Sequence, residues 1–221
     1  AGIKDHVRQG IADHESWWGY AETGAVAGRL NRIVTDAFLE VGVPVVSIQP
    51  SASARCQDGQ LLDMEVHPIR EALRHGLVPL VYGDVALDKE RGCTIVSTEE
   101  VLAFLARRMH PAQMVMVGEV DGVYDRDPLL DESALPIPRI TPATFAHLEM
   151  KLGGSFGVDV TGGMLAKVRE MVSLVAEGQT ERVHLISGWR EGALERVLLD
   201  PGIVEGTLIE QDCELQKGSN W

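Results

Sequence analysis

The alternation of helical stretches with short apolar runs constrains the fold of this chain more than any other feature. The run Val43–Ile48 follows a stretch with helical spacing over 21–41, and the run Leu77–Tyr82 follows another over 65–75. Short, continuously apolar runs are typical of parallel strands that are covered on both faces. Because strand–helix–strand units form parallel sheets with right-handed crossovers, this order predicts an α/β fold.

The rest of the chain continues the same order. We expect a hairpin over 85–96, a polar loop over 121–138, helices over 99–109, 163–177 and 191–199, and strands over 114–117 and 182–187. Ligands of parallel sheets bind at the carboxyl ends of the strands. The loops that follow Ile48, Tyr82 and Val117 are therefore the first places to look for a functional site.

Bulk properties argue against several classes of function. The net charge of −13 disfavours nucleic acid and a membrane surface as partners, because both need a basic face on the protein. No apolar run reaches the length of a membrane span, and the first residues do not resemble a signal peptide. Cys56, Cys93 and Cys213 are far apart, so we expect reduced thiols in a cytoplasmic protein and no metal-ligating residues.

The run Asp159-Val-Thr-Gly-Gly-Met-Leu-Ala-Lys167 carries the strongest local signal for chemistry. The apolar stripe that follows it predicts that Gly162 and Gly163 open a helix, where backbone N–H groups are unpaired and the helix dipole is positive. These glycines let an anion approach the backbone, and Lys167 reaches back towards it as a point charge. The pattern fits a phosphate cradle, and it equally fits a plain helix start followed by a surface lysine.

Four further loops are candidates for a functional site, and three of them leave two interpretations open. Ser51 lies beyond a predicted strand and fits either an acceptor pocket or a capped proline turn. Gly83 permits either close approach of a ligand or a simple turn. The segment Ser97-Thr-Glu-Glu100 is typical of a capping box at a helix start. The acidic residues of Gly118–Asp125 fit either contacts to a nucleotide or a solvated turn.

Taken together, these segments occur in an order that resembles the amino-acid kinase superfamily and, within it, the isopentenyl phosphate kinases. Fosfomycin-resistance kinases share much of the pattern. The resemblance covers roughly residues 20–209. It is carried by Arg29–Asp36, Val46–Ser51, Val78–Asp84, Val120–Asp125, Asp159–Met164 with Lys167, and Glu205–Ile209.

The resemblance implies a three-layer α/β/α sandwich with a mainly parallel central sheet. It implies an acceptor-binding part over 1–110, an ATP-binding part over 111–209 and a tail over 210–221. It also implies ATP and Mg²⁺ as cofactors and a homodimer as the assembly. The implied reaction is transfer of the ATP γ-phosphoryl group to isopentenyl phosphate, a step of isoprenoid biosynthesis.

The resemblance also implies roles for individual residues. Lys167 and Glu100 fall at catalytic positions, and Glu100 stands where the family has an aspartate that organises the phosphate-binding lysines. The resemblance places Glu119, Gly163 and Lys167 at contacts to ATP and Thr98 at a contact to the acceptor. From their places in the same loops we expect Asp121, Gly122 and Gly162 to contact ATP as well. The loops beyond two predicted strands lead us to expect that Gly83 and Ser51 contact the acceptor.

Two departures from the family pattern bear on activity. The family's amino-terminal strand with its lysine and Gly-Gly-Ser loop, and its Gly-Ser-Phe-Gly-His loop, do not precede Ala1. From this we expect a truncated or incompletely represented protein. The segment Ser97-Thr-Glu-Glu100 stands in place of the usual Ser-Gly-Asp-Asp, and a misplacement of about 1 Å at such a site costs about a hundredfold in rate.

The sequence therefore predicts a phosphotransferase that acts on a small phosphorylated isoprenoid. Two alternatives stay open at this point. One is a kinase of the same fold with a different acceptor, such as a phosphonate antibiotic. The other is a nucleotide-binding module without catalytic activity.

Overall fold

The computed structural model describes residues 7, 10, 14–126, 128, 131–152 and 161–212 of the chain. The chain divides into two compact units, Ala1–Leu105 and Ala106–Trp221. Among the helices of the described residues, none is long and apolar enough to cross a membrane.

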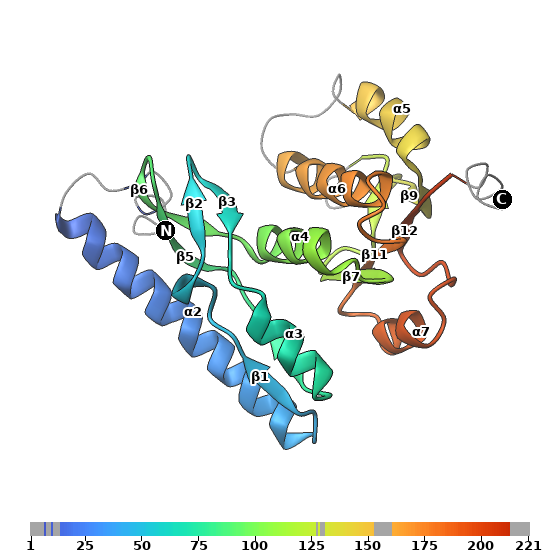
Figure 1. Ribbon diagram of the computed structural model, residues 1–221. Coiled ribbons are helices and arrows are strands. Elements are labelled where there is room, and N and C mark those ends of the chain that lie inside the picture. The colour runs from blue at the N-terminus through green and yellow to red at the C-terminus, as the bar shows by residue number, and fades with distance from the viewer. Residues whose placement is uncertain are drawn as a thin grey trace, which may run out of the picture. The chain divides into compact units, whose positions relative to one another are not determined.

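The described residues of the first unit form short strands, the helices α2 and α3 and the start of α4 (Figure 1). Strands β1 and β4 pair in parallel, and a second sheet has the order β3-β2-β5-β6, in which β2 and β5 are parallel and the two hairpins are antiparallel. The elements are α2 (His14–Glu40), β1 (Val45–Ser47), the 3₁₀ turn η1 (Pro50–Ala52), β2 (Arg55–Gln57), β3 (Gln60–Asp63), α3 (His67–Arg74), β4 (Val78–Leu80), β5 (Asp84–Asp88), β6 (Gly92–Val96) and α4 (Thr98–Met109).

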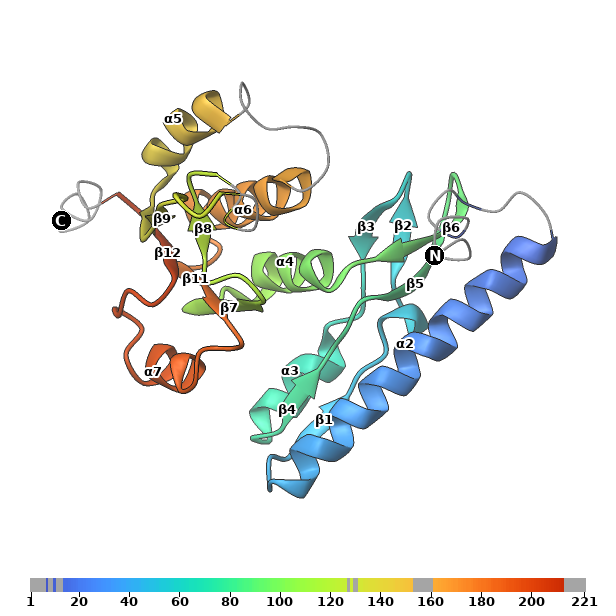
Figure 2. The same cartoon turned by 180° about the vertical axis from the view of Figure 1, so that it is seen from behind.

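Helix α2 faces the strands of this unit with small and polar residues. It runs alongside β1 in both views of the molecule (Figures 1 and 2). A methyl group at Gly24 would lie only 3.1 Å from Cγ2 of Val85, so helix and strand approach closely there. The buried side chain of Asn31 accepts a hydrogen bond from the Ser47 hydroxyl, which ties α2 to β1.

The apolar stripe of α2 lies on its opposite face. Leu30 is 63% exposed and Ile33 is 67% exposed. The sequence pattern predicted the helix correctly, but its strand-facing side carries glycine and short polar residues because only these permit so close an approach. An exposed apolar stripe of this kind is typical of an interaction surface.

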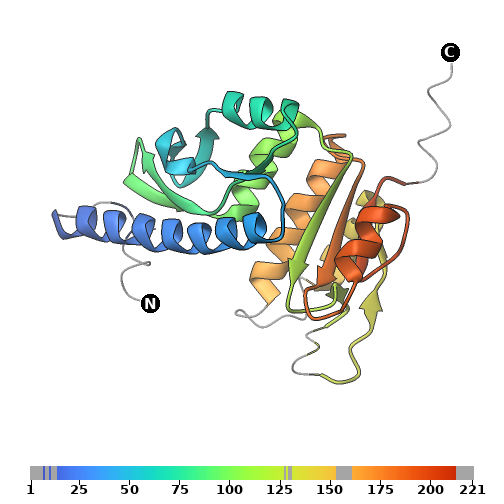
Figure 3. The same ribbon diagram turned by 90° about the horizontal axis from the view of Figure 1, so that it is seen from below.

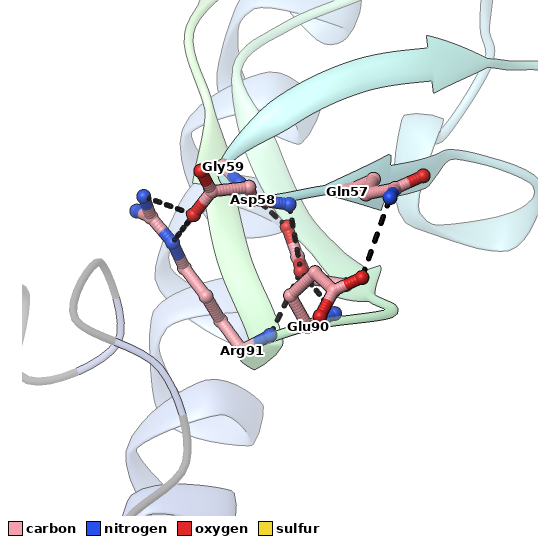
Figure 4. Close-up of polar contacts among 6 residues, drawn as sticks. Gln57, Asp58, Gly59, Glu90 and Arg91 are labelled. Atoms are coloured by element: carbon pink, nitrogen blue, oxygen red, sulfur yellow. Dashed lines mark hydrogen bonds and ion pairs between the residues drawn. The ribbon is translucent and has the colours of Figure 1, made fainter.

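Polar contacts join the turns of the two hairpins of the first unit (Figure 4), and one buried carboxylate accepts four hydrogen bonds among them. Asp88 is buried and accepts backbone N–H bonds from Asp58 at 3.1 Å and Gly59 at 2.7 Å in the β2–β3 turn. It also accepts the N–H groups of Glu90 at 2.8 Å and Arg91 at 2.9 Å in the β5–β6 turn. Burial alone would raise the pKa of Asp88, but these four N–H groups together hold it below its ordinary value.

The second unit is built on a four-stranded sheet of order β10-β12-β11-β7, with a separate β8–β9 pair. Strand β11 is parallel to β7 and antiparallel to β12, while β10 and β12 are parallel. The elements are β7 (Gln113–Gly118), β8 (Val123–Tyr124), β9 (Pro136–Ile137), β10 (Arg139–Ile140), α5 (Pro142–Leu152), α6 (Thr161–Ala176), β11 (Arg182–Ser187), α7 (Ala193–Leu199) and β12 (Thr207–Glu210).

Helices cover both faces of the second unit's sheet. Helix α6 lies on one side of the β7–β11 pair and α7 on the other (Figure 3). The expected stripe of α6 is buried at Val168, Met171, Val172 and Val175. On the other face, Ala193 and Val197 of α7 pack against Ile186. This unit therefore has the three layers, helix, sheet and helix, that the sequence predicted, and the predicted α/β class is confirmed.

Several elements differ from the sequence prediction. Helix α2 begins at His14, so Trp17 and Trp18 lie inside it and not before it, and the ring of Trp17 packs edge-on against Tyr20 with centroids 6.0 Å apart. The predicted loop over 121–138 contains the short strands β8 and β9, which pair with each other. The strands β2, β3, β8, β9, β10 and β12 were not predicted, because each has only two to four residues and none lies in a continuous apolar run as long as those that predicted β1 and β4.

The Asp88 linkage predicts how stability depends on pH. We expect Asp88→Asn to lower the free energy of unfolding by about 2 kcal/mol at pH 7, because the amide offers one neutral acceptor to four donors. A carboxyl group whose pKa is lowered in the folded state stabilises the fold above its unfolded pKa and loses this effect as the pH falls through the folded pKa. Urea titrations of both proteins should give a difference that is full at pH 7 and shrinks as the pH falls below the ordinary pKa of an aspartate. An equal difference at every pH would contradict this account.

Candidate active site

The parallel pair β7 and β11 places two strand ends at one edge of the second unit. Gly118 is the register partner of Ser187, and both are the last residues of their strands. Helix α6 precedes β11 and packs on it, so its first turn lies at this same edge (Figure 3). Loops 119–122 and 188–192 also leave from here. Binding sites of α/β proteins are built at such an edge.

Helix α6 begins at Thr161, so Gly162 and Gly163 lie in its first turn, as predicted. The first N–H groups of a helix lack partners within the helix and attract anions. Lys167 follows on the next turn with an exposed side chain. The preceding residues 153–160, which include Asp159, lie outside the described part of the chain.

The two loops at the strand ends are tied to each other. The N–H of Gly188 donates to the carbonyl of Gly118 at 2.8 Å, and the hydroxyl of Ser187 donates to the carbonyl of Glu119 at 3.2 Å. Beside them lies a cavity of about 620 Å³ between the strand ends and α7. Its walls are mostly apolar, and the residues that line it include Val117, Ser187, Arg190, Leu194, Glu195 and Leu198.

Loop 119–122 holds three of the residues predicted to contact ATP. Glu119 is exposed, whereas Asp121 is partly buried and forms an ion pair with Arg190 at 2.7 Å. Gly122 has a φ of +99°, and a methyl group there would lie 2.6 Å from the Thr207 hydroxyl oxygen. Gly122 is therefore needed for the packing of this loop on β12, whatever its part in binding a ligand.

The first unit brings together the residues predicted to contact the acceptor. The N–H of Ser51 donates to Oδ2 of Asp84 at 3.1 Å, and the N–H of Gly83 donates to the hydroxyl of Thr98 at 2.9 Å. Gly83 leaves no room for a side chain, since a methyl group would lie 2.9 Å from the N atom of Thr98. Residues from η1, from the β4–β5 connection and from the start of α4 thus form one cluster.

Asp84, which directly follows Gly83, is the charged centre of that cluster. It is only 2% exposed. Burial, followed by the negative charge of Asp84, raises the pKa of both Tyr20 and Tyr82. An aspartate directly after Gly83, at the carboxyl end of a predicted strand, was the signal that pointed to it.

Glu100 takes part in the capping box that the sequence indicated. Its Oε2 accepts the N–H of Ser97 at 2.7 Å, and the Ser97 hydroxyl accepts the N–H of Glu100 at 3.2 Å. The reciprocal pair fixes the start of α4 and holds Thr98 beside Gly83. Within the described residues, no group of three or more histidine, cysteine, aspartate or glutamate side chains is arranged to hold a metal ion.

Comparison with known proteins shows which class of protein has this fold. The sequence model of the amino acid kinase family matches residues 3–187. The chain therefore belongs to the amino acid kinase family.

Its relatives include isopentenyl phosphate kinases. That of Methanothermobacter thermautotrophicus is 36% identical over 194 residues, which are 87% of this chain and 71% of the relative. That of Methanocaldococcus jannaschii is 31% identical over 192 residues, 87% of this chain and 68% of the relative. A solved isopentenyl phosphate kinase structure matches 93% of this chain and 77% of its own with a TM-score of 0.76 and 30% identity.

The geometry at Gly122 predicts a large effect of a single methyl group. We expect Gly122→Ala to lower the free energy of unfolding by roughly 2 kcal/mol or more, because it adds a strained φ and a clash with Thr207. Gly178→Ala is the matched control: its φ is +69° but nothing lies within 4 Å of the added carbon. Thermal melts should rank Gly122→Ala below Gly178→Ala, and equal melting temperatures would show that the Thr207 contact is not limiting.

Proposed function

We propose that this chain belongs to an enzyme that uses ATP to phosphorylate isopentenyl phosphate to isopentenyl diphosphate, a reaction of isoprenoid biosynthesis. One structural observation carries the proposal: the first turn of α6, with Gly162 and Gly163, lies at the edge where β7 and β11 end. A helix start at the carboxyl edge of a parallel sheet is suited to polyphosphate binding. Two relatives that match 87% of the chain are isopentenyl phosphate kinases, which supports isopentenyl phosphate as the acceptor.

In this proposal ATP binds to the second unit. The backbone N–H groups of Gly162 and Gly163 hold its phosphates, and Lys167 adds a positive charge one turn further along the helix. Loop 119–122 contributes Glu119, Asp121 and the backbone of Gly122. The apolar cavity beside α7 suits a flat group such as the base of the nucleotide.

Mg²⁺ fits this arrangement as a partner of the nucleotide. Mg²⁺ in phosphotransferases keeps several waters and binds one or two carboxylates together with substrate phosphates. The exposed carboxylate of Glu119, which directly follows β7, would be a ligand of this kind. When bound, the ion would neutralise charge on the phosphates.

The acceptor belongs to the first unit in this proposal. Its phosphate would be contacted by Ser51, Gly83 and Thr98. Glu100 would hold the start of α4, and with it Thr98, in place through the capping box. An oxygen of the acceptor phosphate attacks the γ-phosphorus as the bond to the ADP oxygen breaks. One phosphoryl group is transferred, ADP leaves, and no atom changes its oxidation state. Positioning and electrostatic stabilisation supply most of the catalysis in such transfers.

We propose a homodimer as the assembly and the cytoplasm as its location. The exposed stripe of α2, with Leu30 and Ile33, is an apolar surface that would serve as a dimer interface. Cys56 and Cys93 are free thiols in the structure, in keeping with a reducing compartment.

Kinetics test the reaction and the phosphate site together. The purified protein should form isopentenyl diphosphate from isopentenyl phosphate and MgATP, and EDTA should stop turnover. Lys167→Ala should lower kcat/KM by about a hundredfold, because one charged contact to the transferring group is lost. Lys89→Ala, which changes an exposed lysine of the β5–β6 turn, should leave kcat/KM unchanged.

Other outcomes of this assay would reassign the function. Turnover of a phosphonate antibiotic in place of isopentenyl phosphate would indicate the kinase with another acceptor. Calorimetric binding of ATP without turnover of either would favour the non-catalytic module. Full activity of Lys167→Ala would refute the phosphate site.

The dimer proposal has its own test on α2. Ile33→Glu places a charge in the centre of the exposed stripe and should convert the protein to a monomer in light scattering after gel filtration, because an unpaired charge is costly in an apolar interface. Arg32→Glu, on the neighbouring exposed position, should leave the mass unchanged. A monomeric parent protein would contradict the proposal.

A further inference from the structure

Arg190 lies on the loop between β11 and α7, at the edge where the proposed nucleotide site is built. Its carbonyl accepts the N–H of Ala193 at 3.1 Å, which holds the loop at the start of α7. The neighbouring residues Ser187 and Gly188 are tied to the other loop by the bonds to Glu119 and Gly118. Arg190 is also one of the residues that line the cavity beside α7.

The guanidinium group of Arg190 bridges two carboxylates from different loops. One terminal nitrogen lies 2.7 Å from Oδ2 of Asp121, and the other donates to Oε1 of Glu205 at 3.1 Å. Asp121 belongs to the loop after β7, while Glu205 precedes β12. A planar group with several fixed donors can hold two carboxylates at once, which an ammonium group cannot do with the same geometry.

Glu205 is the fixed end of this bridge. It is 8% exposed, and Arg196 of α7 donates two bonds to it, at 2.9 Å and 3.0 Å. Its hydrogen bonds to Arg196 are the main reason that its pKa falls to about 2, and Arg190 adds to the effect. The carboxylate is therefore charged and held in place at any pH near neutrality.

Asp121 is the second carboxylate that Arg190 holds, and its orientation depends on this contact. Its Oδ1 atom is buried and has no hydrogen-bond partner within the described residues, so the contact of Oδ2 with Arg190 is what orients the group. Two further facts place this contact in the proposed site: Asp121 stands on the loop at the end of β7, and Arg190 lines the adjacent cavity. The Asp121 side chain keeps 24% of its surface exposed, so a carboxylate oriented in this way can accept a hydrogen bond from a ligand hydroxyl.

We propose that Arg190 is a positioning residue for nucleotide binding: anchored on Glu205, it holds the Asp121 carboxylate in the orientation in which it meets the nucleotide. This inference rests on the proposed function only in taking the ligand to be ATP. It assigns Arg190 no contact with the reacting atoms. Its effect on binding passes through Asp121.

Calorimetry with a non-hydrolysable ATP analogue and Mg²⁺ tests the proposal without need of an acceptor. Arg190→Gln should weaken binding about tenfold, by analogy with metal sites, where loss of a residue that orients a metal ligand costs about ten- to a hundredfold in affinity. Asp121→Asn should weaken it to a similar extent. The double variant should bind about as weakly as Asp121→Asn alone, because the two changes remove one and the same contribution.

Arg182→Gln is the matched control. Arg182 lies at the other end of β11, where it donates to the carbonyl of Pro201 at 3.0 Å, and its loss should leave nucleotide affinity unchanged. Thermal melts of all variants separate a loss of affinity from a loss of folding.

The outcomes distinguish this proposal from the proposed function. Parental affinity in Arg190→Gln, or fully additive losses in the double variant, would overturn the positioning role. A parent protein that binds the analogue but never transfers phosphate would end the kinase proposal and leave the positioning role standing on the binding data. A parent protein that binds no nucleotide would overturn both.

Discussion

The parallel pairing of β7 with β11 is the interaction on which the candidate site depends. It aligns Gly118 with Ser187, so two loops and the first turn of α6 meet at one edge of the second unit. Each loop alone is an ordinary turn. In the proposed function the shared edge brings the helix start and the acidic loop together, as is common for binding sites of parallel sheets.

Buried carboxylates organise the loops in both units, but by different means. In the first unit Asp88 and Asp84 are held by backbone N–H groups, which fixes turns without any positive side chain. In the second unit Glu205 is held by arginines. The second arrangement is balanced in charge, because Arg190 and Arg196 face the carboxylates of Glu205 and Asp121.

The sequence predicted the long helices, the apolar strands and the α/β class because these depend on local periodicity. It also located Gly162 and Gly163 in the first turn of α6, since glycines before an apolar stripe mark a helix start. It could not predict that Asp88 joins two turns, that Arg190 bridges Asp121 and Glu205, or that Leu30 and Ile33 lie outside. Those features arise from contacts between segments far apart in the chain, and a single sequence carries no signal for them. The roles of Lys167, Glu100 and the acceptor residues remain predictions.

The central claim is that the phosphates of the nucleotide bind at the first turn of α6. A crystal structure of the protein with Mg²⁺ and a non-hydrolysable ATP analogue measures this directly. The account predicts phosphate oxygens within hydrogen-bond distance of the N–H groups of Gly162 and Gly163, with the Lys167 amine directed towards them. Phosphates bound elsewhere, with that helix start facing only solvent, would contradict it.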